Sequence, residues 1–184
     1  MVLTLLVISA ISSASLGFMH ELTKGPKAAA ELIKQNFAIM AVLPKFDNNP
    51  SEEYFLIDSF CGGEQLVCFP ASIDGNIVGY AVNSWTTRGY SGLIRIMVGF
   101  DKNGNILNST VVEHMETPGL GTKMAEPAFK DQYIGKNPRR NNIRIRNDGG
   151  EINGITAATI TARAFSDAVL RAFRSLENAG KFEE

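Results

Sequence analysis

The fold of this chain is decided by the uncharged stretch NGITAATIT, residues 153–161, together with the segment that follows it. In residues 163–176, apolar or small side chains recur at spacings of three and four, which is typical of an amphipathic helix. The stretch therefore predicts a helix start, with Thr156 as the N-cap and Thr159 in the first turn. Backbone N–H groups in such a first turn lack intrahelical acceptors.

A phosphate bound at this helix start would meet those N–H groups and the positive end of the helix dipole. The small side chains of Ala157 and Ala158 would let a bulky ligand approach the backbone closely. On this chemistry alone, an ordinary capped helix start remains the simpler interpretation.

The chain upstream of this helix is expected to form an antiparallel meander. Short runs in which apolar and polar residues alternate are separated by turn signals, and the Asp74-Gly75 pair is typical of a two-residue hairpin. Beyond the meander we expect a short helix at Pro127–Tyr133 and a final strand at Arg139–Arg146. The predicted strands of the meander are Tyr54–Phe60, Gln65–Ala71, Ile77–Trp85, Ser91–Phe100 and Ile106–His114.

The segment HMETPGLGTK, residues 114–123, joins the meander to the short helix. Pro118, Gly119 and Gly121 favour a turn that would present Leu120. The simple interpretation is a connection between two elements. The functional interpretation is a loop that packs an apolar residue on a flat ring while its backbone amides contact the ring edge.

The N-terminal segment is long and apolar, since Val2–Met19 carries no charged residue. The run reaches the lower limit for crossing a bilayer core. We favour a membrane anchor over a signal peptide because no basic residue precedes it. Gly25-Pro26 is expected to break the helix, and a stalk helix is expected at Ala28–Val42. The predicted domains are an anchor (residues 1–25), a stalk with a linker (26–51) and a globular domain (52–184).

Composition and charge exclude some classes of partner. The chain has 184 residues and a net charge of −1, and its only arginine-rich segment is residues 139–146. Such clusters are commonly solvated, so no nucleic-acid partner is expected. Cys61 and Cys68 are the only cysteines, and they are too few for a metal site. Either a disulfide across a short loop or two free thiols would fit the sequence.

Three blocks of the sequence, in this order, resemble the FMN-binding domain family. They are GYSGLI at residues 89–94, the loop at 114–121 and the stretch at 153–161. In that family, an Asp, two variable residues and Ser/Thr-Gly-Ala-Thr form a flavinylation motif, whose last Thr carries FMN through a phosphodiester bond. Thr159 matches that threonine, while Asn153 replaces the Asp and Ala157 replaces the Gly.

The resemblance, which covers roughly residues 52–178, implies an α+β fold. A membrane-anchor and stalk helix would precede an antiparallel β-sheet domain with flanking helices. It also implies FMN joined to Thr159 by a phosphoester, added by a separate flavin transferase, with no catalytic residue and no metal. The residues expected to contact the cofactor lie in the three blocks, at Tyr90, His114, Glu116, Thr117, Leu120, Gly121, Lys123, Thr156, Ala157, Ala158, Thr159 and Ile160.

Within that family, the chain resembles subunits of membrane-bound, ion-translocating electron-transport complexes of the Rnf and sodium-pumping NADH:quinone oxidoreductase types. This implies an electron-transfer subunit with a single-pass anchor in a bacterial inner membrane. The FMN domain would lie on the periplasmic side, and other subunits of the complex would be its partners. The sequence contains no Ser/His/Asp set, P-loop or dinucleotide glycine fingerprint, so a self-contained catalyst is not expected.

Two alternatives stay open. One is a pilin-like structural protein, although Leu5 occupies the position at which pilins carry an acidic residue early in the apolar helix. The other is a periplasmic module that binds a ligand other than FMN on the same fold.

Overall fold

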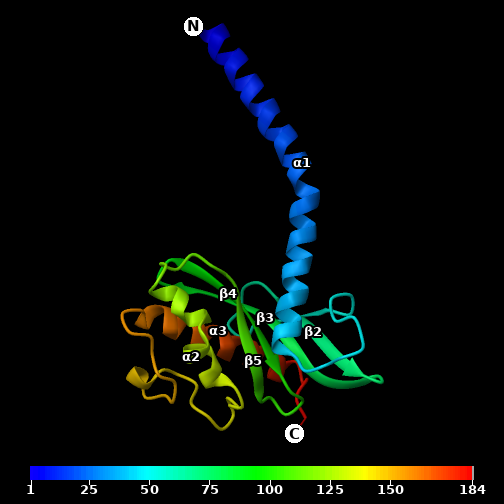
Figure 1. Cartoon of the computed structure of the whole chain (residues 1–184), viewed down its shortest axis with the longest axis vertical. Helices are drawn as coiled ribbons and strands as arrows, with labels where there is room; N and C mark the ends of the chain where they lie inside the picture. Colours follow the sequence, from blue (N-terminus) through cyan, green and yellow to red (C-terminus); the bar gives the residue numbers. More distant parts are fainter. Residues whose placement is uncertain (184) are drawn as a thin grey trace. The chain divides into compact units, whose positions relative to one another are not determined.

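The structure, a computed structural model, describes residues 1–183 and contains within them a five-stranded antiparallel sheet with flanking helices (Figure 1). This confirms the α+β fold class expected from the sequence. The elements are α1 (Val2–Val42), β1 (Phe55–Ile57), β2 (Leu66–Ile73), β3 (Asn76–Gly89), β4 (Gly92–Phe100), β5 (Ile106–His114), α2 (Pro127–Lys130) and α3 (Thr159–Asn178). Short 3-10 turns occupy Gly121–Ala125, Asp131–Tyr133 and Arg146–Asp148.

The sheet is a meander in which each strand pairs with the next one in the chain, in the order β1-β2-β3-β4-β5. Between the paired residues Ile73 and Asn76, both Asp74 (φ 51°) and Gly75 (φ 76°) adopt positive φ, as a type I′ hairpin turn requires. Strand β5 has its predicted bounds. Strand β1 is shorter than predicted, since only Phe55–Ile57 pairs with β2.

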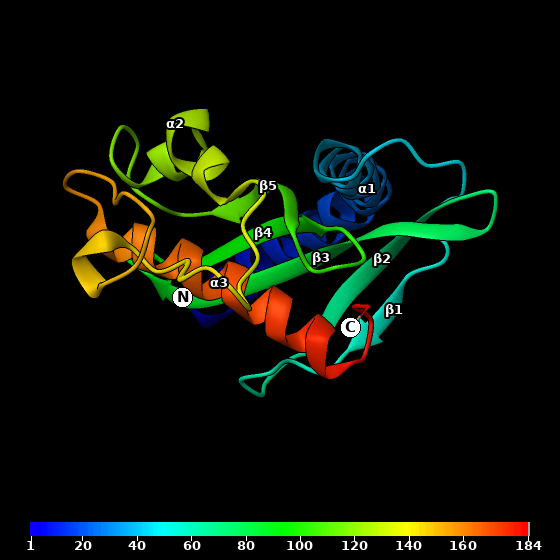
Figure 2. The same cartoon turned by 90° about the horizontal axis from the view of Figure 1, so that it is seen from below.

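Helix α3 packs along one face of the sheet and forms the main core with it (Figure 2). Ile94, Ile96 and Val98 of β4 all belong to this core, because alternate side chains of a strand point to the same face. A buried hydrogen bond, 2.8 Å long, runs from the Ser84 hydroxyl of β3 to the Ala168 carbonyl of α3. These contacts fix α3 relative to β3 and β4.

The opposite face of the sheet is covered by the last residues of α1. A second hydrophobic cluster joins Ile39 and Val42 of this helix to Phe69 of β2 and Met97 of β4. Gly99 of β4 permits the close approach, since a Cβ at that position would overlap the Val42 carbonyl. Both faces of the sheet are therefore buried, one by α3 and one by the end of α1.

The chain divides into two compact units, Met1–Asn36 and Phe37–Glu184, with the division inside α1. Helix α1 is continuous from Val2 to Val42, so the predicted break at Gly25-Pro26 is wrong. A proline removes one main-chain hydrogen bond and commonly kinks a helix rather than ending it. The N-terminal part of α1 is long and apolar enough to cross a membrane, by length and composition.

The predicted strand at Arg139–Arg146 is also wrong, because this segment folds into successive turns. The Asn142 side chain accepts a hydrogen bond from the Arg144 N–H at 3.3 Å. Local side-chain bonds of this kind compete with the ladder bonds of a strand. Among the described residues, the only β-type pairing in this segment is one parallel bridge between Ile145 and Ile152.

Candidate functional site

A cavity of about 550 Å³ lies where the first turn of α3 meets the loop that follows β5. Its volume is within the range of sites that bind a small molecule or a cofactor. Nine of the twelve residues predicted to contact a cofactor line it, and Thr161 lines it as well. The lining residues are Tyr90, Glu116, Thr117, Leu120, Gly121, Ala157, Ala158, Thr159, Ile160 and Thr161.

The other three predicted residues, His114, Lys123 and Thr156, are not among those that line the cavity. His114 ends β5, and its Nδ1 accepts a hydrogen bond from the Glu116 N–H at 3.1 Å. Its imidazole therefore shapes the loop that enters the cavity. Lys123 and Thr156 are both exposed to solvent.

Helix α3 begins at Thr159, and its N-cap position is held by Ala158. The prediction that Thr156 is the N-cap is therefore wrong. The cause is Ala157, whose left-handed backbone (φ 62°) turns the chain just before the helix. Because alanine has no side-chain acceptor, no side chain caps the helix. The N–H groups of its first turn stay available to a bound anion.

Glu116 forms a buried wall of the cavity, with only 4% of its surface exposed. Its Oε1 accepts a hydrogen bond from the Ser91 N–H at 3.0 Å, and its Oε2 accepts one from the Thr161 hydroxyl at 2.6 Å. The carboxylate thus ties the turn between β3 and β4 to the first turn of α3. Since both carboxylate oxygens accept hydrogen bonds from the protein, the role of Glu116 is to hold the walls of the cavity together.

Thr161 is the lining residue that the sequence predictions missed. Its signal was present, because it is the third hydroxyl of the uncharged 153–161 stretch. A threonine inside a helix commonly bonds a carbonyl of its own helix, so spacing gave no reason to connect Thr161 with Glu116. Only the tertiary fold brings these two residues together.

Two glycines leave the space that Glu116 occupies. A Cβ at Gly121 would lie 2.6 Å from Glu116 Cβ, and a Cβ at Gly89 would lie 2.7 Å from Glu116 Oε1. Both distances are far shorter than an optimal non-bonded contact. A side chain at either position would therefore displace the buried carboxylate.

Exposed apolar side chains surround the mouth of the cavity. Tyr90, Leu120 and Ile160 line it and remain 71%, 42% and 47% exposed. Large apolar side chains gathered around a concavity are typical of a binding surface. This arrangement fits FMN, because a flat and largely apolar ring could lie against these side chains while its phosphate meets the first turn of α3.

The described residues contain no group of three or more His, Cys, Asp or Glu side chains that could hold a metal ion. Both cysteines are free thiols, with Cys61 exposed and Cys68 buried. Of the two states that the sequence allowed, the structure therefore shows the unpaired one. Burial raises the pKa of the Cys68 thiol, which keeps it protonated and unreactive at neutral pH.

Replacing Ala157 with glycine is expected to stabilise the protein by about 1 kcal/mol, because a left-handed backbone strains a residue that has a Cβ. Urea unfolding of the full chain in detergent micelles would measure this change. Ala158→Gly is the matched control, since φ at Ala158 is −138° and its side chain is buried in the core. That variant should lose stability. Equal losses in the two variants would contradict the assignment of strain to Ala157.

Comparison with known proteins gives the class of this site. The sequence model of the FMN-binding domain matches residues 89–174, a range that contains every residue lining the cavity. The crystal structure of NqrC from Shewanella oneidensis shares the fold, with a TM-score of 0.51 and 18% identity over 77% of this chain and 72% of that one. An FMN-binding domain that follows a long apolar helix is thus the class of protein defined here.

The chain belongs to the family of G subunits of ion-translocating oxidoreductase complexes. It is 30% identical over 190 residues to the G subunit of the Na⁺-translocating ferredoxin:NAD⁺ oxidoreductase complex of Acetobacterium woodii, covering 97% of this chain and 91% of the relative. It is 35% identical over 179 residues to the G subunit of the ion-translocating oxidoreductase complex of Salmonella typhi, covering 92% and 86%. The resemblance inferred from the three sequence blocks is confirmed, and it favours a flavin carrier over a pilin-like protein.

Proposed function

We propose that this chain is an electron-transfer subunit of a membrane-bound, ion-translocating oxidoreductase complex, and that it carries FMN on Thr159 through a phosphodiester bond. The observation that supports the attachment most is the position of Thr159. It is the first residue of α3, its side chain is partly exposed, and it lines the cavity that the predicted residues form. Bound FMN supplies the capacity to accept and release electrons.

Different residues of the chain would bind the phosphate and the ring of FMN. The uncapped first turn of α3 would bind the phosphate through its N–H groups. Tyr90, Leu120 and Ile160 would lie against the ring, and Thr117 would offer a polar contact from the loop. Glu116 would keep the two walls in place through its bonds to Ser91 and Thr161.

The Thr159 hydroxyl has no built-in base. Within residues 1–183 it makes no hydrogen bond to a histidine or a carboxylate, and the buried Glu116 carboxylate nearby bonds Thr161 instead. Activation of a hydroxyl needs an adjacent base or an equivalent group. A separate flavin transferase would therefore attach the FMN.

The proposed setting follows from α1 and from the family. The apolar part of α1 would anchor the chain in a bacterial inner membrane by a single pass, with the FMN domain on the periplasmic side. The relatives in Acetobacterium woodii and Salmonella typhi are by name subunits of complexes. Other subunits of such a complex would then exchange electrons with the flavin.

Intact-mass spectrometry of the full chain tests this proposal. Protein produced together with a flavin transferase should gain the mass of one FMN less one water, and protein produced without the transferase should not. The Salmonella typhi relative, produced with the same transferase, is the positive control. If that relative is modified while this chain keeps its unmodified mass, the covalent carrier proposal is wrong.

A further inference from the structure

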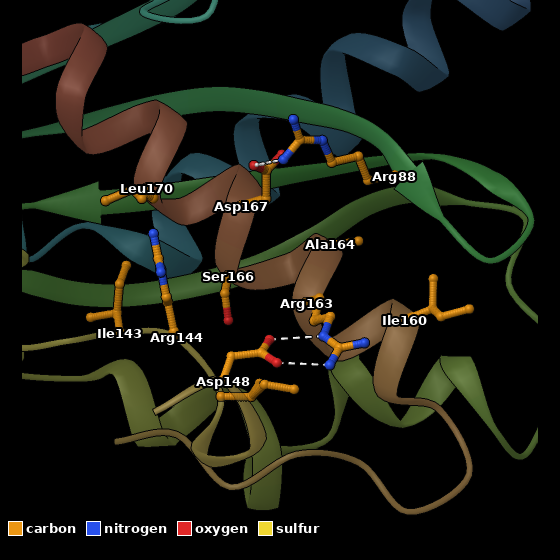
Figure 3. A pocket seen from close by; sticks show the side chains of 11 residues that line it. Arg88, Ile143, Arg144, Asp148, Ile160, Arg163, Ala164, Ser166, Asp167 and Leu170 are labelled. Carbon is orange, nitrogen blue, oxygen red and sulfur yellow. Dashed lines mark hydrogen bonds and ion pairs between the residues drawn. The ribbon is translucent and has the colours of Figure 1, made fainter. Parts of the chain in front are cut away.

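We call the cavity that is proposed to hold FMN the flavin cavity. A second concave region, lined mainly by charged side chains, lies beside it. It consists of one cavity of about 410 Å³ (Figure 3) and one of about 340 Å³, which share Ile143, Arg144 and Leu170 in their linings. One wall is α3 and the other is the segment of residues 138–148. We call this feature the arginine groove. The proposed flavin carrier function does not use it.

The arginine groove follows α3 over a distance that a single small ligand would not fill. Ile160, Arg163, Asp167, Leu170 and Arg174 line it, and their spacings of three and four place them on one face of the helix. The first and the last are fourteen positions apart in α3, which corresponds to about 21 Å at about 1.5 Å per residue. A surface or a segment of another protein matches this length better than a small ligand does.

The groove begins at the flavin cavity. Ile160 lines both hollows, next to the proposed attachment residue Thr159. Arg163 lies about one turn further along α3, on the side that faces the groove. Its guanidinium forms a bidentate ion pair with the Asp148 carboxylate, with N–O distances of 2.7 and 2.8 Å (Figure 3). A protein seated in the groove would therefore lie against the flavin site.

The charge of the groove is strongly positive. Six arginines and two aspartates line the two cavities. The aspartates are already engaged, Asp148 by Arg163 and Asp167 by Arg88 at 3.0 Å. Arg163 holds the pKa of Asp148 below its usual range through this hydrogen bond, so the carboxylate stays charged and paired. The arginines that line the cavities are Arg88, Arg139, Arg140, Arg144, Arg163 and Arg174.

Three of these arginines form no ion pair within the described part of the chain, although the charge of Arg144 helps to lower the pKa of Asp148. Arg140 and Arg144 are exposed, and their side chains make no ion pair there. The Arg174 guanidinium lies 4.7 Å from the centre of the Phe60 ring. Arg139 pairs with Glu177 at 2.7 Å. The pattern is local, because residues 45–75 contain six acidic side chains and one basic one, whereas residues 138–148 contain four arginines and one aspartate.

We propose that the arginine groove is the docking site for an acidic surface of the subunit that exchanges electrons with the flavin. Guanidinium groups bind carboxylates by paired hydrogen bonds, and complementary charge speeds and orients the encounter of two proteins. The proposal rests on the proposed function, since it presumes a flavin next to Ile160. The length of the groove and its continuity with the flavin cavity favour a protein over a lipid headgroup or a small phosphate.

Two sets of variants test this docking site in the full chain, produced with the other subunits of its complex. Arg140→Glu with Arg144→Glu should slow electron delivery into the flavin about tenfold at low salt and remove most of the salt dependence. Lys45→Glu with Lys102→Glu makes the same change in net charge outside the groove and should leave the rate unchanged. Arg144→Lys introduces an amine that a carbodiimide should couple to a carboxylate of another subunit.

The outcomes separate this proposal from the proposed function. Covalent FMN, measured by mass, should be equal in all variants, and its absence from the unaltered chain would contradict the carrier function alone, since the Arg144→Lys crosslink needs no flavin. The docking site is wrong if that crosslink joins no other subunit, or if the two charge-reversal pairs give equal rates. It is equally wrong if Arg140→Glu with Arg144→Glu abolishes binding of phosphatidylglycerol vesicles or inorganic phosphate while electron delivery into the flavin keeps its rate.

Discussion

A Thr159→Ala variant is expected to carry no covalent FMN at all when it is produced with a flavin transferase. The loss should be complete because Thr159 carries the one partly exposed hydroxyl in the first turn of α3, whereas the Thr117 hydroxyl lies on the loop that follows β5. Thr161 is buried and bonded to Glu116, and Thr156 lies outside the lining of the cavity, before the left-handed residue Ala157. Intact mass and flavin fluorescence of the denatured protein both measure the result.

Two controls make this loss specific to one oxygen. Thr159→Ser keeps the hydroxyl at the first position of α3 and should retain covalent FMN, while Thr156→Ala should leave the occupancy unchanged. Thr159→Ala itself should fold, because the side chain is only partly buried and caps nothing. Full flavin mass on Thr159→Ala would show that another residue is the acceptor.

The sequence predicted most of the fold where its signals are local. The Asp74-Gly75 pair specified a hairpin because positive φ at both positions is a property of those residue types. The amphipathic pattern of residues 163–176 predicted α3, although the helix extends further, over Thr159–Asn178. Two sequence signals gave wrong predictions, because the surrounding structure decides their outcome. Pro26 did not end α1, and residues 139–146 formed turns rather than a strand.

The candidate site was predictable to the extent that it is built from contiguous blocks. The loop after β5 and the start of α3 supplied most of the cavity lining. What could not be predicted depends on distant contacts. Glu116 meets Ser91 and Thr161 across 25 and 45 residues of sequence, and no periodicity connects them. The left-handed backbone of Ala157 could not be predicted either, because alanine rarely adopts that conformation.

Replacing Glu116 with alanine is expected to lower the free energy of unfolding by about 3 kcal/mol, since a buried polar group left without a partner costs about 1–3 kcal/mol. The variant would leave the Ser91 N–H and the Thr161 hydroxyl without their acceptor. Glu116→Gln keeps the shape and one acceptor oxygen, so it should lose only about 1 kcal/mol. Urea unfolding of the full chain in detergent micelles measures both changes.

A matched control comes from the same end of β5. Glu113 forms a surface ion pair with Arg95 at 3.3 Å, so Glu113→Ala should change the stability by less than about 0.5 kcal/mol. The flavin gives a second readout, because Glu116→Gln leaves Thr159 untouched but removes a negative charge from the cavity wall. Covalent FMN should then persist, while its midpoint potential should rise, since reduction adds negative charge to the ring. If Glu116→Ala is as stable as Glu113→Ala, the buried carboxylate does not hold the two walls of the cavity together.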